Sequence, residues 1–314
     1  MDSTYNVLVT GCGGDIGQSI GKILKSSALF SKVIGCDMTD EHASIFIYDK
    51  VSKIPGCNSA EYMPSLEAIV AQEEIDIILP ISEPELRLLT EQKIEYSFLN
   101  KVLICANLEA MEIGFDKYAT ARFLQKASLP FPETNIIGDV PEPILPLILK
   151  SRTGAGSKSV FVLNQKDEFE FYKKKYPDFI VQELLENADE EYTCGVFKSL
   201  GGDIRTIIYK RKLVDSYSGF GVVVENKSID NLLVKIANGL NLRGSINVQL
   251  RLAAKGPCVF EINPRFSSTV MFRHLMGFED IIWSIQDALG LSISSYSKPL
   301  VGTKFYKGFT EYVN

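Results

Sequence analysis

Three side chains between residues 249 and 263 carry oxygen atoms that can bind a metal ion, and an arginine follows them at position 265. Glu261 and Asn263 are two positions apart in an apolar run, so they project from the same face of the strand that this run predicts. Gln249, on the preceding predicted strand, can converge with them. One carboxylate and two amides suit Mg²⁺, and Arg265 can neutralise a phosphoryl group or hold a carboxylate. Because a Glu/Asn pair inside an apolar strand is costly if it is only structural, these residues predict a metal and phosphate site.

A second candidate site combines two lysines with a loop of small residues. Lys150 ends a predicted strand and can present a fixed positive charge. In the loop that follows, Gly154, Gly156 and Ser157 let backbone amides approach phosphate oxygens. The loop lacks the G-x-x-x-x-G-K-[ST] pattern of a P-loop, and a flexible hairpin is the alternative. Lys117, at the start of a predicted helix, is unfavourable there unless an anion or acid offsets it; taken alone, a solvated lysine is the more common explanation.

Two further patterns are less specific. Residues 181–185 (VQELL) read as a strand end whose backbone could contact an adenine edge, with an acid at Glu191 for ribose hydroxyls; an ordinary buried strand end is the alternative. Residues 11–17 (GCGGDIG) follow a predicted strand and open a helix, and Asp37 stands where a dinucleotide-binding fold places its ribose acid. The G-x-G-x-x-x-G spacing is one residue longer than the usual fingerprint, so a glycine turn that only packs the first helix is the alternative.

The elements that must position these residues fall into three groups. Residues 6–10, 33–36, 76–80 and 102–105 read as buried strands that alternate with helices near 64–72 and 84–95, which predicts a parallel, doubly wound sheet. A helix is expected over 115–127, with Phe115, Ala119, Phe123 and Ala127 on one face, before a stretch that holds five of the thirteen prolines and predicts a hinge. A small α+β unit follows, with strands at 144–150, 160–163 and 179–185. After it come antiparallel strands at 192–198, 203–209, 213–217, 245–251 and 258–263, with an amphipathic helix over 229–240.

Composition restricts the class of protein. The 314 residues, 46% hydrophobic and 23% charged, are typical of a globular chain with about two units at ~150 residues each. A net charge of −6 argues against a nucleic-acid or anionic-membrane partner, and no apolar run approaches the ~20 residues of a membrane span. Asp2 and the lack of a basic leading segment argue against a secretory signal, and six cysteines without a C-x-x-C pair indicate reduced thiols, so we expect a cytoplasmic protein. His42 and His274 are the only histidines, which leaves little material for histidine-based triads or metal sites.

Taken together, the motifs resemble the ATP-grasp superfamily, especially its single-chain ligases similar to carbamoyl-phosphate synthetase. The resemblance runs in order along almost the whole chain, through DIILPISEPEL, FDKYATARFLQKASLPFP, ILKSRTGAGSKS, IVQELLENADEEY and SINVQL…VFEINPRFS. It implies an ATP-grasp fold of the α/β and α+β classes. Its expected parts are a Rossmann-like pre-ATP-grasp domain with a parallel sheet over 1–113, a small lobe with the linking helix over 114–189, and a C-terminal lobe with the metal site over 190–314.

The resemblance also implies roles for individual residues, with ATP between the central and C-terminal lobes. Lys117 and Lys150 match nucleotide-phosphate lysines, and Gly154, Gly156 and Ser157 lie in the loop that closes over ATP. Glu183 and Leu185 match the adenine-edge segment, and Glu191 matches the ribose acid. Gln249, Glu261 and Asn263 match ligands of Mg²⁺, for which Mn²⁺ can substitute. Arg265, Arg211 and Lys150 match residues that act on the transferred phosphoryl group.

The implied activity is ligation of a carboxylate to an amine or ammonia through an acyl phosphate, with release of ADP and phosphate. The partners expected are these small molecules, with a homodimer as the assembly. Two alternatives stay open: an NAD(P)-dependent oxidoreductase that uses the N-terminal glycines, and a non-catalytic nucleotide-binding protein on a retained fold. The chain departs from the family in having Ser267, Ser268 and Thr269 where glycine is common, and in having only Gly154 and Gly156 in the loop. The first departure concerns the acceptor pocket and the second the closure of the loop.

Overall fold

The computed structural model describes residues 4–154, 160–186, 189–214, 217–308 and 310–313. Its N-terminal unit is built on a six-stranded sheet with the order β3-β2-β1-β4-β6-β5. All its pairings are parallel except that of β5 with β6. Its strands are β1 (Tyr5–Thr10), β2 (Phe30–Asp37), β3 (Lys50–Lys53), β4 (Ile77–Pro80), β5 (Ser97–Phe98) and β6 (Lys101–Leu103). Its helices are α1 (Asp15–Lys25), η1 (Ala43–Phe46), α2 (Tyr62–Gln72) and α3 (Glu83–Glu91).

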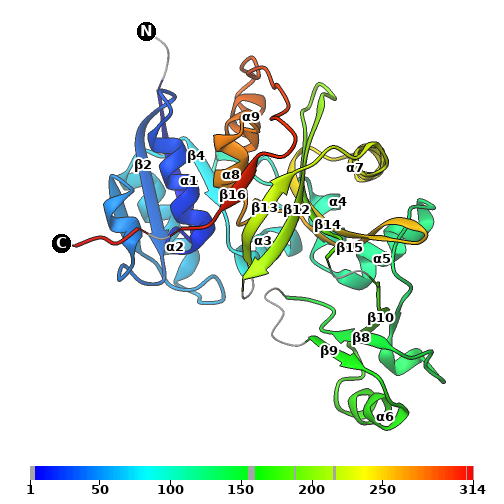
Figure 1. Ribbon diagram of the computed structural model, residues 1–314. Coiled ribbons are helices and arrows are strands. Elements are labelled where there is room, and N and C mark those ends of the chain that lie inside the picture. The colour runs from blue at the N-terminus through cyan, green and yellow to red at the C-terminus, as the bar shows by residue number, and fades with distance from the viewer. Residues whose placement is uncertain (1–3, 155–159, 187–188, 215–216, 309, 314) are drawn as a thin grey trace.

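Alternate residues of β1 face opposite sides of this sheet. Val7 and Val9 pack with α1, whereas Leu8 packs with α2 on the other face. Helices therefore cover both faces, and the predicted doubly wound sheet is confirmed (Figure 1).

Two helices, not one, link this unit to the rest. The helix expected over 115–127 is confirmed in α5 (Lys117–Lys126), which begins after Asp116; a separate helix, α4 (Leu108–Gly114), precedes it. The Asp116 carboxylate accepts hydrogen bonds from the backbone amides of Tyr118 and Ala119, which caps a new helix at this point. The buried residues of α5 are Thr120, Ala121 and Leu124, whereas Ala119 and Phe123 are half-buried.

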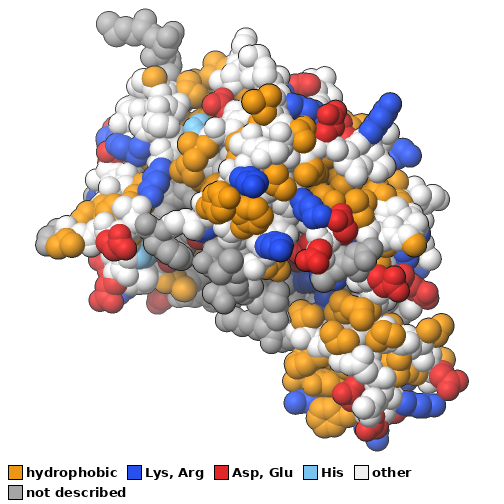
Figure 2. Space-filling view, in the orientation of Figure 1, with side chains coloured by type: hydrophobic (Ala, Val, Ile, Leu, Met, Phe, Trp, Pro, Cys, Tyr) orange, Lys and Arg blue, Asp and Glu red, His pale blue; other side chains and the backbone are white. Residues whose placement is uncertain are grey.

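The small lobe is a four-stranded antiparallel sheet with the order β7-β10-β8-β9, covered by one helix. It contains β7 (Thr134–Ile136), η2 (Ile137–Asp139), β8 (Leu147–Lys150), β9 (Val160–Leu163), α6 (Lys166–Lys175) and β10 (Ile180–Glu183). The strand expected from residue 144 starts only at Leu147, because Pro146 has no amide hydrogen for the ladder. This lobe projects from the body of the molecule, and hydrophobic side chains gather on its surface, among them exposed Val162 and Phe171 (Figure 2).

The C-terminal lobe is a six-stranded antiparallel sheet with the order β15-β14-β11-β12-β13-β16. Its strands are β11 (Glu191–Lys198), β12 (Ile204–Val214), β13 (Tyr217–Val223), β14 (Gly244–Ala253), β15 (Gly256–Asn263) and β16 (Lys304–Tyr306). Its helices are α7 (Lys227–Gly239), α8 (Val270–Leu275) and α9 (Asp280–Ala288).

One expectation for this lobe is wrong. The strand expected over 213–217 is divided between two strands: Leu213 and Val214 end β12, and Tyr217 begins β13, its antiparallel partner, while residues 215–216 lie outside the described residues. The amphipathic helix is confirmed in α7, whose residues Ile229, Leu232 and Ile236 join the core against this sheet. No helix in the described part of the chain combines the length and apolar character that crossing a bilayer requires.

Candidate active site

A cavity of about 640 Å³ lies where the small lobe faces the C-terminal sheet. Every residue that the ATP-grasp resemblance assigns to nucleotide, metal or phosphoryl chemistry, and that the structure describes, lines this cavity. These are Lys117, Lys150, Gly154, Glu183, Leu185, Glu191, Arg211, Gln249, Glu261, Asn263 and Arg265. Gly156 and Ser157 lie outside the described residues. The cavity thus collects residues from α5, from the small lobe and from six positions on the C-terminal sheet or just beyond it.

The expected metal ligands come from two neighbouring strands of the large sheet. Gln249 of β14 is paired with Glu261 of β15, and Asn247 is paired with Asn263 two ladder positions further on, on the same face of the sheet. Residues directly opposite in an antiparallel pair have Cβ atoms about 4.5–5.5 Å apart, so the four side chains stand together on the face that lines the cavity. Carboxylate and amide oxygens are hard ligands, and this set fits Mg²⁺.

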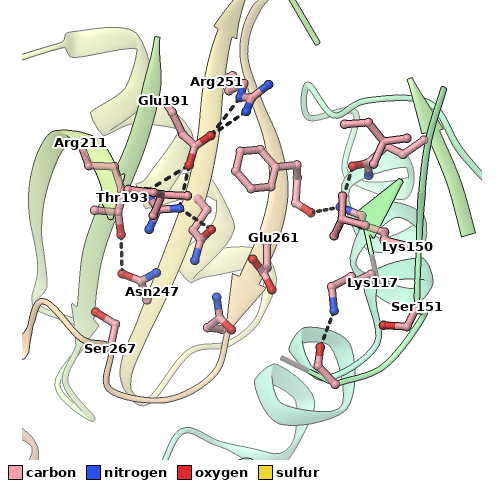
Figure 3. Close-up of a pocket in the computed structure, with 18 of the residues that line it drawn as sticks. Lys117, Lys150, Ser151, Glu191, Thr193, Arg211, Asn247, Arg251, Glu261 and Ser267 are labelled. Atoms are coloured by element: carbon pink, nitrogen blue, oxygen red, sulfur yellow. Dashed lines mark hydrogen bonds and ion pairs between the residues drawn. The ribbon is translucent and has the colours of Figure 1, made fainter. Parts of the chain in front are cut away.

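Lys150 faces this group from the small lobe (Figure 3). It is the last residue of β8, and its Nζ donates a hydrogen bond to Gln182 Oε1 at 2.7 Å. Burial lowers the pKa of the Lys150 ammonium to about 8; the nearby Glu261 carboxylate opposes this shift, and the charge of Lys117 adds to it. The amine is therefore desolvated and held by the sheet before any ligand is bound.

Lys117 lies beside Lys150 at the start of α5 (Figure 3). Its Nζ donates to the carbonyl oxygen of Gly154 at 2.7 Å, and its backbone amide donates to the carbonyl oxygen of Arg152 at 3.0 Å. Arg152 in turn pairs with the carboxylate of Asp116, Nη2 to Oδ2 at 2.6 Å. The acid that caps α5 thus ties the helix start to the loop after β8, a pairing that the sequence pattern did not reveal.

Glu191 stands between two arginines on the other side of the cavity. Its Oε1 lies 2.9 Å from Arg211 Nη2, and its Oε2 lies 2.8 Å from Arg251 Nη2. Arg211 Nη2 also donates to Gln249 Oε1 at 2.8 Å, which links a candidate metal ligand to this ion-pair cluster. A ribose hydroxyl would have to use lone pairs that the two guanidinium groups leave free, so the role of Glu191 as a ribose acid stays a prediction.

Glu183 and Leu185, the residues expected at the adenine edge, both line the cavity, and both make polar contacts within the chain. The Glu183 carboxylate turns to Lys255 Nζ at 2.5 Å and to the backbone amide of Glu133 at 3.0 Å. Leu185 is buried, and its carbonyl oxygen accepts a hydrogen bond from Arg251 at 3.3 Å. Ile148 and Leu213 add apolar surface to the cavity nearby.

Three polar residues at the site have no assigned role in the sequence analysis. Arg251 and Asn247 line the cavity on β14 at two-residue steps from Gln249, so the period of a strand could have found them. Arg273 of α8 is fully buried; it donates to Asn247 Oδ1 and pairs with Asp280 Oδ2 at 3.0 Å. In the sequence, the one indication of a role for Arg273 is that this arginine follows three apolar residues of α8.

The N-terminal glycines form a packing turn. A Cβ at Gly17 would lie 2.6 Å from the Cα of Cys12, and one at Gly13 would lie 2.3 Å from a ring carbon of His42. The two carboxylate oxygens of Asp37 accept hydrogen bonds from the backbone amides of Gly13 and Met38, each at 2.7 Å. His42 therefore occupies the space over the turn, and each Asp37 oxygen holds a backbone amide with one of its lone pairs, which favours the packing turn over a dinucleotide site.

Comparison with known proteins gives two domain matches. A family model described as an ATP-grasp domain matches residues 115–269, and one described as a PylC-like N-terminal domain matches residues 7–103. The large chain of carbamoyl phosphate synthase from Thermoplasma volcanium is 22% identical over 281 residues, which cover 77% of this chain and 26% of that protein. The corresponding large chain from Methanosarcina mazei is 25% identical over 226 residues, or 64% of this chain and 20% of that protein. This chain therefore spans about a quarter of such relatives or less.

Solved structures show the same architecture. An ADP complex of N5-carboxyaminoimidazole ribonucleotide synthetase superposes with a TM-score of 0.74 at 15% identity, covering 97% of this chain and 81% of that one. The biotin carboxylase domain of 2-oxoglutarate carboxylase from Hydrogenobacter thermophilus gives a TM-score of 0.75 at 16% identity, over 96% of this chain and 74% of that one. At these identities the likeness establishes the fold, and the sheets and helices above follow it over nearly their whole length.

Proposed function

The chain belongs to the ATP-grasp superfamily, and from this premise we propose that it is an ATP- and Mg²⁺-dependent ligase that joins a carboxylate to an amine or ammonia. One observation carries the proposal. The oxygen ligands of Gln249, Glu261 and Asn263 and the amines of Lys117 and Lys150 line the same cavity between the two lobes. Such a cavity suits a polyphosphate that bridges a divalent cation and fixed positive charges.

Related solved structures support the nucleotide, metal and ligase parts of this proposal. The biotin carboxylase domain was solved with MgADP and bicarbonate, and the synthetase with ADP. An L-amino acid ligase from Bacillus licheniformis shares the fold with a TM-score of 0.68 at 16% identity, over 91% of this chain and 75% of that one. The same biotin carboxylase domain is described as a dimer, and a homodimer is the assembly that we propose for this chain.

The donor set suggests how the nucleotide would be held. Apolar side chains including Ile148 and Leu185 would pack against the base, and Lys150 and Lys117 would meet the phosphates from the small lobe. Mg²⁺, and Mn²⁺ in its place, would be held by Glu261, Asn263 and Gln249, where its charge would offset that of the phosphate oxygens. Gln249 would turn its oxygen from Arg211 toward the ion.

The proposed reaction has two displacements. A carboxylate oxygen attacks the γ-phosphorus of ATP, the bond from that phosphorus to the bridging oxygen breaks, and ADP leaves. The amine nitrogen then attacks the carbonyl carbon of the acyl phosphate, inorganic phosphate leaves, and the nitrogen loses a proton to solvent. The chain's task is positioning and charge neutralisation, which fits a cavity lined by lysine and arginine.

Arg265 is placed to act on the transferred group. It lines the cavity just beyond Asn263, and its Nη1 donates to the carbonyl oxygen of Phe266 at 3.1 Å. Burial lowers the pKa of its guanidinium, while the nearby Glu83 and Glu261 oppose that shift. A desolvated guanidinium strengthens its interaction with developing negative charge. Ser267 and Ser268 line the cavity next to it and would contribute hydroxyls to the acceptor pocket.

Substitution of the metal ligands tests the proposal. We expect Glu261→Ala and Asn263→Ala each to abolish ADP release at saturating Mg²⁺ while the protein keeps its fold, because both side chains serve the metal. The assay is ADP release over a panel of carboxylates crossed with amino acids, other amines and ammonia.

Glu142→Ala is the matched control, since its exposed carboxylate pairs with Lys166 on the small lobe, away from the cavity. Near-normal turnover in either ligand variant would refute the site. A wild-type chain that binds Mg-ATP yet turns over no pair of substrates would favour the non-catalytic alternative.

A further inference from the structure

Three potential metal ligands meet at the glycine turn of the N-terminal unit, away from the cavity. Cys12 lies in the turn after β1, Asp37 ends β2, and His42 immediately precedes η1. A sulfur, a carboxylate oxygen and a ring nitrogen of these residues lie within 4.8 Å of one another. None of the three lines the cavity described above.

The buried ring nitrogens of His42 give a second, independent reason to expect a bound ion at this site. Both of its ring nitrogens are shielded from solvent, and neither has a hydrogen-bond partner in the described part of the chain. A neutral imidazole carries one donor and one acceptor, and burying them without partners is costly. A metal ion bound at one nitrogen would remove part of that cost.

The surrounding backbone holds the three groups in place. Glycine at position 13 makes the approach possible, since a Cβ there would lie 2.6 Å from His42 Nε2 and 3.0 Å from Asp37 Oδ2. The amides of Gly13 and Met38 orient the Asp37 carboxylate. The Ser44 hydroxyl donates to the carbonyl oxygen of Cys12 at 2.6 Å, which ties η1 to the turn. Such outer contacts orient ligands in metal sites.

We propose that Cys12, Asp37 and His42 bind one Zn²⁺ ion. Thiolate, imidazole and carboxylate are the ligands that zinc takes, whereas Mg²⁺ prefers oxygen alone. Three protein ligands leave a fourth position for water, and binding releases the thiol proton to solvent. Cys12 is buried while Asp37 and His42 are half-buried, so an ion can reach the site from solvent. The ion stabilises the N-terminal sheet by joining the β1–α1 turn, the end of β2 and η1.

Cobalt is the probe for this site, because a Co²⁺–thiolate bond absorbs light where Mg²⁺ and a cobalt ion bound by oxygen ligands do not. The full chain, stripped with a chelator, is titrated with Co²⁺ and then with Zn²⁺. We expect a charge-transfer band that saturates at one equivalent and disappears on addition of zinc. We also expect Zn²⁺ to raise the melting temperature of the stripped protein.

Two ligand variants and two controls decide the assignment. His42→Gln and Cys12→Ser should weaken Co²⁺ binding by at least about tenfold, since loss of outer-shell partners alone costs about 10–100-fold. Cys57→Ser and His274→Gln, which alter a half-buried thiol and the other histidine, should bind as the wild type does. His42 is the less buried ligand, so His42→Gln keeps the test valid if Cys12→Ser fails to fold. Absence of the band in the wild type, its retention in His42→Gln, or its loss in Cys57→Ser would each overturn the proposal.

Discussion

Lys150 shows how one residue acquires its chemistry from its surroundings. A lysine amine in water keeps its proton well above neutral pH, but here burial lowers the pKa to about 8. Among the described residues, the Glu261 carboxylate across the cavity counters this shift in pKa, whereas the charges of Lys117 and Arg251 add to it. The neighbouring charges therefore compensate the Lys150 ammonium only in part. A more highly charged anion, such as a polyphosphate, would favour the protonated form more strongly than a single carboxylate does.

This pKa predicts a pH dependence of ATP use. Because the free protein loses the Lys150 proton as pH rises through about 8, kcat/KM for ATP should decline in that range, and it should level off below it. Lys150→Met should lower kcat/KM by about 10²–10³-fold and remove the decline, since it has no charge to lose. Steady-state kinetics across pH on the wild type and the variant measure both effects.

Two further variants make this test specific to Lys150. Lys150→Arg keeps its charge, so its kcat/KM should stay flat through pH 8 although the longer guanidinium fits less well. Lys126→Met, at the exposed end of α5, should behave as the wild type. A decline that persists in Lys150→Arg would mean that another group titrates.

At the scale of elements, α8 packs behind β14, the strand that carries the candidate metal ligand Gln249, and is joined to it by a buried hydrogen bond. Its residue Arg273 is fully buried, where it pairs with Asp280 of α9 and donates to Asn247 of β14. Thr193 of β11 also binds the Asn247 oxygen, at 3.0 Å. Two helices and two strands are therefore joined by one polar network directly behind the cavity, and its loss should cost stability.

Arg273→Met tests this network. It leaves the Asp280 carboxylate buried with only Ser245 as a partner, and breaking a buried ion pair typically costs about 3–5 kcal/mol. We expect a decrease of that size in the free energy of unfolding, measured with urea. Adding Asp280→Asn should recover part of it, because the uncompensated charge is gone. Arg122→Met, on the surface of α5, serves as the control, and a loss under about 1 kcal/mol in Arg273→Met would contradict the interpretation.

At the scale of the whole molecule, the cavity depends on all three units. α1 contributes Ile16 to its lining, the small lobe contributes Lys150, and the large sheet contributes the oxygen ligands. The C-terminal segment crosses back over the N-terminal unit, where Tyr312 stacks on Phe46 with ring centroids 5.1 Å apart (Figure 1). Lys307, in the same segment, pairs with Asp15 at the start of α1. A ligand that bridges the lobes should therefore stabilise the molecule as a unit.

Ligand-induced stabilisation distinguishes the nucleotide classes. At an ATP concentration about one hundred times Kd, Mg-ATP should stabilise the folded protein by about 2.7 kcal/mol, seen as a higher melting temperature. NADH should give no shift, because His42 fills the space over Gly13 and Asp37 already binds two amides. Glu261→Ala should reduce the Mg-ATP shift. A shift with NADH that Gly13→Val removes would instead support the oxidoreductase alternative.

Much of the architecture and of the candidate site could be predicted from the sequence, because it depends on short-range periodicity. The two-residue period of a strand places Glu261 and Asn263 on one face, and Gln249 lies opposite in the ladder. Strand–helix alternation predicts the parallel N-terminal sheet in the same way. These inferences need only neighbours within a few residues and the usual pairing of adjacent strands.

Other features depended on the tertiary structure, because they join residues far apart in the chain through single contacts that leave no periodic trace. Arg251 meets Glu191 from 60 positions away, and Arg273 meets Asn247 from 26. The break between α4 and α5 follows from Asp116, which both caps α5 and pairs with Arg152 of the next lobe. The approach of His42 to Gly13 likewise requires η1 to pack over the first turn. Local sequence propensity does not predict this packing, because it depends on residues 32 positions apart.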